Sequence, residues 1–196
     1  MTSLPDRRAQ RARPRARRRE GITLVEAAVV VCVVGIVLAV FIPTFVRELR
    51  TSKTSEAVEH LSILSDRAAA YFATEFPQEE GPTLRRCLPP TAGPTPRAPT
   101  VDPAPVRFDA EETPGHATWQ ALGFSPRYDV RYAYTFEPTS SGCGLRSPEG
   151  SYLLTLRAEG DLDDDGERSL FERRMAADEH GVLHSFGILY IRDRVE

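Results

Sequence analysis

The feature that most constrains this chain is an apolar run near its beginning. Residues 27 to 42 include no charged side chain, and from Ile22 to Ile42 the single charge is Glu26. A helix over these 21 residues rises about 30 Å, which matches the hydrocarbon core of a bilayer. The run therefore predicts a helix that inserts into a membrane.

Glu26 is the unusual residue of this segment. A carboxylate one turn inside a membrane helix is unfavourable by several kcal/mol unless a partner neutralises it. The membrane segment of this chain offers no such partner, so the position is a functional hypothesis. Alternatively, Glu26 lies near enough to the lipid headgroups to stay hydrated, and the spacing alone leaves both interpretations open.

The residues around Glu26 resemble a processing motif. The cleavage and methylation motif of type IV prepilins and type II secretion pseudopilins is similar to Gly21-Ile22-Thr23-Leu24-Val25-Glu26. The resemblance implies that a prepilin peptidase cuts after Gly21 and methylates the new amine of Ile22. It also implies that Glu26 pairs with the N-terminal amine of a neighbouring subunit during assembly.

Two further residues fit the same resemblance, which is specific over residues 18–46. Gly35 and Pro43 stand where this family usually has a glycine and a proline. A helix can soften or kink at such residues. We therefore count both positions with Glu26 as expected assembly residues.

Charge predicts how the chain is oriented. Residues 1–21 carry eight arginines against Asp6 and Glu20, a net charge of +6, and the rest of the chain carries −9. Basic residues before an apolar segment remain in the cytoplasm. An arginine-rich start also occurs in nucleic-acid-binding arms, but the adjoining apolar run favours a membrane leader. We expect a single pass through the inner membrane, with the C-terminal domain in the periplasm.

The sequence after Pro43 predicts an α+β fold. Residues 22–46 form the membrane and assembly part of one long helix that continues to Glu75, and residues 47–76 form its amphipathic outer part. The apolar stripe expected to face a core comprises Phe45, Leu49, Ala57, Leu61, Leu64, Ala68 and Phe72. Their spacing of three or four residues, or multiples of it, fits one helix face.

The remaining residues predict a connection and then a sheet. Residues 77–115 hold ten of the sixteen prolines and predict an extended, loop-like connection. Residues 116–196 hold the strand patterns, at 128–136, 152–156 and a hairpin of 170–175 with 182–191 about the turn 178–181. We expect three or four antiparallel strands packed on the outer half of the helix, the roll that the resemblance implies for pilins.

An acidic stretch matches a calcium-loop pattern. Residues 161–172 fit D-x-D-x-D-G-x5-E, in which alternate carboxylates surround one calcium ion. The expected ligands are the side chains of Asp161, Asp163, Asp165 and Glu172 and the carbonyl of Glu167. A strand pattern precedes this loop where an EF-hand has a helix, so a solvated acidic turn is the alternative. We favour calcium, which some major pseudopilins hold in loops of the β-region.

The cysteines predict a disulfide, whereas the histidines do not predict a metal site. Cys87 and Cys143 fall in the part assigned outside the cytoplasm, where thiols oxidise, and we expect a disulfide between them. Cys32 fits a small packing residue. His180 and His184 have a spacing found in zinc sites, although no other ligand motif accompanies them. The sequence shows no recognisable nucleophile and base pair, which agrees with a protein that is not an enzyme.

These observations favour a structural filament subunit. Its expected partners are other copies of itself or related pilins in a helical filament, the prepilin peptidase and the inner-membrane assembly machinery. The alternative is a permanently membrane-anchored extracytoplasmic protein that binds calcium or acts as an adhesin. Type IV pilus, secretion pseudopilus and DNA-uptake pilus remain open, and a nucleic-acid partner is expected only for the last.

Overall fold

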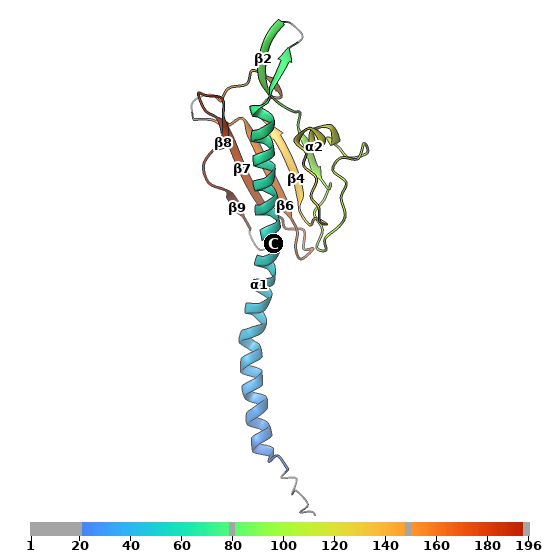
Figure 1. The fold of residues 1–196 in the computed structure, drawn as a ribbon. Helices are drawn as coiled ribbons and strands as arrows, with labels where there is room; N and C mark the ends of the chain where they lie inside the picture. Colours follow the sequence, from blue (N-terminus) through green and yellow to red (C-terminus); the bar gives the residue numbers. More distant parts are fainter. Residues whose placement is uncertain (1–20, 79–80, 148–149, 194–196) are drawn as a thin grey trace, which may run out of the picture. The chain divides into compact units, whose positions relative to one another are not determined.

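The computed structural model describes residues 21–78, 81–147 and 150–193. The chain divides into two compact units, residues 1–43 and residues 44–196. Helix α1 (Leu24–Ala73) begins in the first unit and ends in the second (Figure 1). The predicted helix from Ile22 to Glu75 is therefore confirmed to within two residues at each end. Residues 1–20 of the expected leader lie outside the described part.

The first unit is the apolar part of α1. The 22 residues from Leu24 to Phe45 are long and apolar enough to cross a membrane, and none of them is buried within the chain. A signal sequence near an N-terminus can satisfy the same criteria of length and composition. Pro43 lies inside the helix, where its missing N–H removes one intrahelical hydrogen bond.

The second part of α1 supplies one wall of a hydrophobic core. The predicted stripe is confirmed over its outer half, where the buried residues are Ala57, Leu61, Leu64, Ala68 and Phe72. The prediction for Phe45 is wrong, because its side chain is 63% exposed. The side chain of Leu49 lies outside the described part. The core therefore begins about three turns after Phe45.

A mixed fold of helix and antiparallel sheet surrounds this core. The main sheet has the order β3-β4-β6-β7-β8, with β9 also paired to β7. Its strands are β3 (Ala92–Thr95), β4 (Ala133–Pro138), β6 (Leu154–Gly160), β7 (Ser169–Ala177), β8 (Leu183–Ser185) and β9 (Tyr190–Arg192). Every adjacent pair is antiparallel. The predicted α+β class and the antiparallel pairing are thus confirmed, with more strands than expected.

A smaller sheet and a short helix complete the second unit. The smaller sheet has the order β1-β2-β5. Its strands are β1 (Glu75–Gln78), β2 (Gly81–Leu88) and β5 (Gly142–Cys143), and α2 spans His116–Leu122. Cys87 lies opposite Cys143 in the β2–β5 ladder, and a disulfide joins them. The bond connects residues 56 positions apart.

The Pro-rich segment is more regular than predicted. It contains β2 and β3 as well as the second half of β1. Pro77 and Pro94 lie in β1 and β3, each of which is the first strand of its sheet. An edge strand tolerates proline because one side of its backbone needs no ladder hydrogen bond.

The predicted strand over residues 128–136 is wrong in its first half. Tyr128 is 83% exposed, and β4 begins at Ala133. The physical reason is that the N–H groups of Arg131 and Tyr132 donate to the side chain of Glu56 on α1 and not to a neighbouring strand. Alternation of apolar and polar residues cannot reveal a competing acceptor from a distant helix.

The C-terminal hairpin has the predicted turn and a divided second strand. The N–H of Gly181 donates to the carbonyl of Asp178 over 2.9 Å, and the Asp178 carboxylate accepts the N–H groups of Val182 and His180. These backbone hydrogen bonds lower the pKa of Asp178. Residues 182–191 form β8 and β9, separated by four residues, where one strand was expected.

Candidate functional site

The expected processing site is accessible. Gly21 and Ile22 precede α1, and Ile22 is 76% exposed. A Cβ placed on Gly21 would meet no atom within 4 Å. The peptide bond between Gly21 and Ile22 therefore lies outside regular secondary structure, where a protease can bind the extended backbone.

The backbone of Glu26 takes part in a helix start that the sequence interpretation missed. The side-chain oxygen of Thr23 accepts the N–H of Glu26 over 3.2 Å, and its carbonyl accepts the N–H of Ala27. Thr23 is thus the N-cap of α1, with glutamate at the third helical position, which is the spacing of a capping box. The T-x-x-E pattern could have predicted this start. Capping and intersubunit pairing are separate reasons for a glutamate at this position.

The other two assembly residues are not packed against the part of the chain that the structure describes. A Cβ on Gly35 would meet no atom within 4 Å, and Pro43 is exposed. The apolar side chains around them are exposed as well, with Val31 at 70% and Phe41 at 67%. Such a surface is stable only when lipid or another protein covers it.

Three of the predicted metal ligands converge in the loop between β6 and β7. Asp161, Asp163 and Asp165 each offer a carboxylate oxygen, and these oxygens lie within 4.8 Å of one another. Asp161 Oδ1 is buried and receives no hydrogen bond from the described residues. Ionised carboxylates this close repel each other, and carboxylate oxygens are the type of ligand that hard cations such as calcium take. Glu167 is exposed, and its N–H donates to Asp165 Oδ1 over 2.8 Å.

Glu172 does not join these aspartates. It lies on β7 opposite Arg157, where Arg157 Nε donates to its carboxylate over 2.9 Å and Arg174 Nη2 over 2.7 Å. Burial alone would raise the pKa of Glu172, but the hydrogen bonds from the two arginines lower it. The prediction of a bidentate Glu172 ligand is corrected, because a strand replaces the exiting helix of an EF-hand and its carboxylate is already neutralised.

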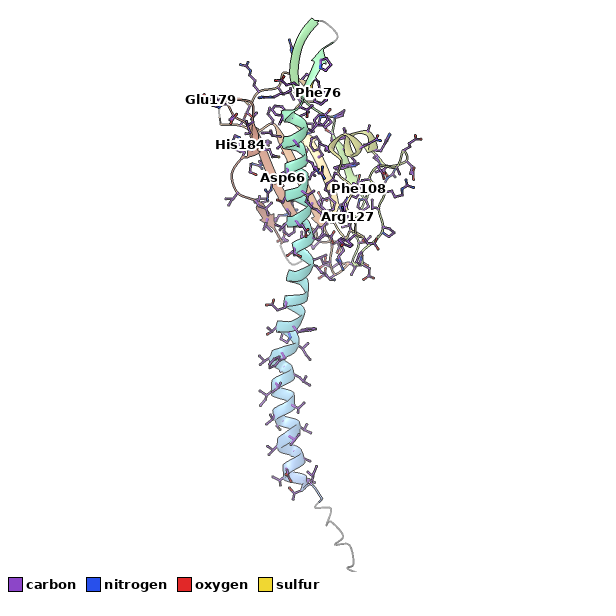
Figure 2. The ribbon with its side chains drawn as sticks, in the orientation of Figure 1. Asp66, Phe76, Phe108, Arg127, Glu179 and His184 are labelled. Atoms are coloured by element: carbon purple, nitrogen blue, oxygen red, sulfur yellow. A yellow bond between two sulfur atoms is a disulfide. The ribbon has the colours of Figure 1, made fainter. Side chains whose placement is uncertain are left out.

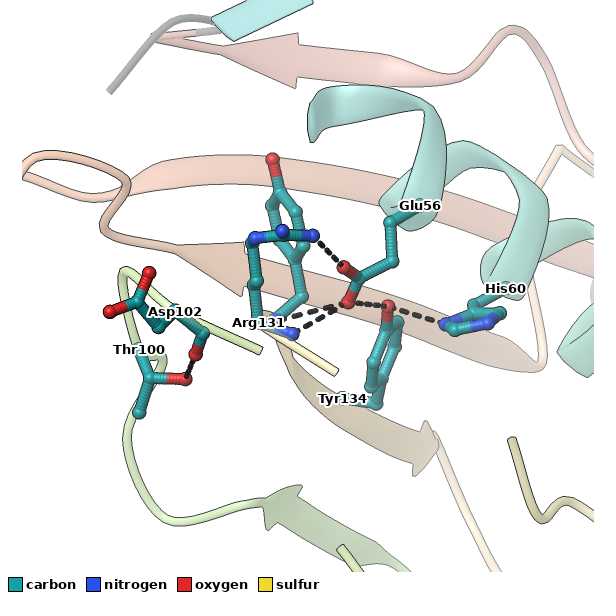
Figure 3. Close-up of polar contacts among 7 residues, drawn as sticks. Glu56, His60, Thr100, Asp102, Arg131 and Tyr134 are labelled. Carbon is teal, nitrogen blue, oxygen red and sulfur yellow. Dashed lines mark hydrogen bonds and ion pairs between the residues drawn. The ribbon is translucent and has the colours of Figure 1, made fainter. Parts of the chain in front are cut away.

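A cluster of polar side chains joins α1 to the sheet, as Figure 3 shows. Glu56 Oε1 accepts the N–H of Arg131 over 2.8 Å and that of Tyr132 over 3.3 Å. It also accepts the Tyr134 hydroxyl over 3.2 Å, while Arg131 Nη1 lies 3.4 Å from Oε2. One side chain on the helix therefore satisfies the backbone just before β4.

His60 extends this cluster. The single hydroxyl hydrogen of Tyr134 points to the Glu56 carboxylate, which can only accept, so His60 Nδ1 must donate to the Tyr134 oxygen over 2.8 Å. Burial lowers the pKa of His60 and, together with Glu56, raises that of Tyr134. Both groups are held neutral, which suits a structural connection.

Two hollows of the described surface have linings of different chemical character. The larger, of about 910 Å³, is lined by Arg85, Arg86, Arg146, Asp178, Glu179 and His180 among others. This mixture of charges selects neither an anion nor a cation. The smaller, of about 530 Å³, lies over the Cys87–Cys143 disulfide. Neither is lined by the Glu56 cluster or by the three aspartates.

No protein-family model, curated protein or solved structure matches this chain. The chain's own residues are therefore the evidence for its function. They provide an accessible Gly21–Ile22 bond, an uncovered apolar helix and a folded α+β unit.

Proposed function

We propose that this protein is a structural subunit of a type IV pilus or pseudopilus. The observation that supports it best is the contrast within α1. The same helix leaves residues 24–45 uncovered and buries a stripe from Ala57 to Phe72 against an antiparallel sheet. A filament whose core is made of such helices would bury the uncovered part, because packing removes its apolar surface from water.

In the proposed assembly, the expected processing and assembly residues act one after another. A prepilin peptidase cuts after Gly21 and methylates the amine of Ile22, and Glu26 then attracts the amine of a neighbouring copy. The second unit folds in the periplasm, where oxidation forms the Cys87–Cys143 disulfide. In this proposal the protein catalyses no reaction, and its partners are other pilins, the peptidase and the inner-membrane assembly machinery.

A membrane anchor without an assembly step is the second candidate. The exposed apolar part of α1 favours it equally, since lipid alone can cover such a helix. In that case residues 1–21 stay attached, and the second unit serves as an extracytoplasmic calcium-binding or adhesive domain. The two candidates differ in the N-terminus of the protein in the cell.

The mass of the mature N-terminus is the decisive measurement. We expect the chain isolated from surface or periplasmic filaments to begin at N-methylated Ile22, as measured by mass spectrometry of its N-terminal peptide. Gly21→Leu should block the cut and leave the chain in the membrane. Chains that retain residues 1–21 in the filament fraction would refute the proposal, and chains that retain them in the membrane fraction alone would favour the permanent anchor.

We further propose that the three aspartates hold calcium and couple its binding to folding. Asp161, Asp163 and Asp165 would supply the charged ligands, and calcium would remove their mutual repulsion. The detergent-solubilised protein should then melt at a higher temperature in millimolar calcium than in chelator. Asp163→Ala should abolish the difference, whereas Asp129→Ala, which removes an exposed aspartate elsewhere, should preserve it. Identical melting curves of the unmodified protein with calcium and chelator would exclude the metal.

A further inference from the structure

The Cys87–Cys143 disulfide is unequally exposed at its two ends. Only 6% of Cys87 is exposed, whereas Cys143 is exposed. Glycines stand on both sides of Cys143, at positions 142 and 144, so neither chain neighbour has a side chain that could cover it. A Cβ placed on Gly142 would meet no atom within 4 Å. Access is one of the factors that decide which sulfur of a disulfide a thiolate attacks, and here it favours Cys143.

The smaller hollow of the surface reaches this bond. Both cysteines line it, as do Tyr71 and Phe76, whose ring centres are 5.0 Å apart. Phe76 is labelled in Figure 2, where α1 gives way to β1. None of the described residues that line this hollow is charged. A small thiol, or an uncharged peptide segment that carries one, can therefore approach the bond without displacing an ion pair.

The disulfide belongs to a hairpin that stands outside the hydrophobic core. The apolar core cluster includes Phe72 and Leu88 but none of the described residues between them. Strands β1 and β2 form an antiparallel hairpin over this interval, and Figure 1 shows it projecting past the end of α1. An isolated two-stranded hairpin is at best marginally stable in water. This hairpin therefore depends on what holds it to the rest of the second unit.

The base of the hairpin is held by a short ladder and by Arg86. β2 and β5 share two residue pairs, and one of these is the disulfide itself. The Arg86 carbonyl accepts the N–H of Gly144 over 2.8 Å, and the Arg86 guanidinium donates to the carbonyl of His180 over 2.5 Å. Each such hydrogen bond adds little net stability, because water competes for both partners. The covalent bond is the strongest of these restraints.

We propose that this disulfide is a site of thiol–disulfide exchange, at which a dithiol attacks Sγ of Cys143 and releases the hairpin. A thiolate of the dithiol bonds to Sγ of Cys143, the bond between the two cysteines breaks, and Cys87 leaves as a thiolate that takes up the proton given up by the dithiol. The second thiol of the reagent then displaces Cys143 from the mixed disulfide. Both cysteines are thereby reduced, and the dithiol is oxidised to a disulfide.

Release of the hairpin is a local opening. Once β2 is no longer linked covalently to β5, the hairpin can separate from the second unit while the core cluster, to which it contributes no described residue before Leu88, stays folded. The same steps in reverse would form the bond, with Cys143 as the first nucleophile. The inference is independent of the proposed filament function, because it concerns the second unit alone.

Trapping with a monothiol tests the site of attack. The detergent-solubilised chain carrying Cys32→Ala would be treated with reduced glutathione, quenched with acid at early times and mapped by mass spectrometry. We expect the glutathione adduct on Cys143 to exceed that on Cys87 about tenfold or more, since access to the sulfur governs the attack. Equal adducts, a preference for Cys87, or a disulfide that reacts only in denaturant would overturn the proposal.

Hydrogen exchange tests the release. After reduction with dithiothreitol, the amides of residues 81–88 should exchange about tenfold faster or more, whereas those of β6 should keep their rates. The fluorescence of Trp119, the single tryptophan of the chain and fully buried, should not change. A control with both Cys87→Ser and Cys143→Ser should exchange fast in the hairpin with or without dithiothreitol. Unchanged exchange in the hairpin would refute its release, and a changed Trp119 signal would show that reduction unfolds the core instead.

Discussion

Glu26→Gln is expected to leave the protein produced, inserted and cleaved, while filament yield falls by more than about tenfold. Glutamine can still occupy the third position of a capping box, because that motif accepts either residue. The variant therefore removes the charge and preserves the local helix start that Thr23 forms with residue 26. Filament yield after shearing, measured against total processed protein, would report the loss.

Two controls separate charge from capping. Thr23→Ala removes the N-cap, which typically costs about 1 kcal/mol of helix stability, and should assemble far better than Glu26→Gln. Glu48→Ala removes another exposed glutamate of α1 and should assemble normally. Equal yields from Glu26→Gln and the unmodified chain would mean that assembly does not need the charge at residue 26, and the intersubunit ion pair would then have to be abandoned.

Gly160→Ala should strongly destabilise the second unit. A Cβ at Gly160 would lie 2.4 Å from Tyr132 Cε1 and 2.9 Å from Ser169 Oγ. Tyr132 is fully buried and packs edge-on against Phe171 with ring centres 5.7 Å apart, so its ring cannot move aside. We expect a loss of about 3 kcal/mol and a melting temperature about 6–12 °C lower.

A second substitution tests whether the ring of Tyr132 causes this loss. Tyr132→Leu removes the ring atoms that meet the new methyl group, so the double variant should be more stable than the sum of the single effects predicts. Additive losses in thermal unfolding would instead place the strain of Gly160→Ala in the backbone.

The parts of the fold that follow a local periodicity could be predicted from the sequence. The stripe from Ala57 to Phe72 has the helical repeat, and the strand near Leu154 alternates apolar and polar residues along its sequence. The turn at residues 178–181 has its own local hydrogen bonds. In each of these elements the groups that determine the structure are close together in sequence.

The missed features depend on distant residues or on conformations that periodicity does not describe. β4 starts late because Glu56, 75 residues before Arg131, accepts its backbone N–H. The short helix α2 lies between Gly115 and Gly123, both in the left-handed conformation, and it was not expected. Its Trp119 donates to Thr95 across the core, a contact that spacing does not indicate.

The same distinction holds for the candidate site. The three aspartates that converge are separated by one residue each, and their pattern predicted the convergence. Glu172, further along the chain, was wrongly included because the sheet places it between Arg157 and Arg174. A ligand pattern taken from a helix–loop–helix motif does not transfer to a loop between strands.

The Glu56 cluster also makes mutational tolerance unequal on its two sides. Two of its hydrogen bonds come from the backbone N–H groups of residues 131 and 132, which every amino acid except proline provides. Substitutions at those two positions can therefore preserve the two backbone hydrogen bonds, whereas at position 56 the acceptor is the side chain itself. Glutamine there would turn amide hydrogens toward donors that need an acceptor. Deep mutational scanning should find position 56 intolerant and position 131 depleted mainly of proline, whereas the buried ring of Tyr132 restricts position 132 for a separate reason.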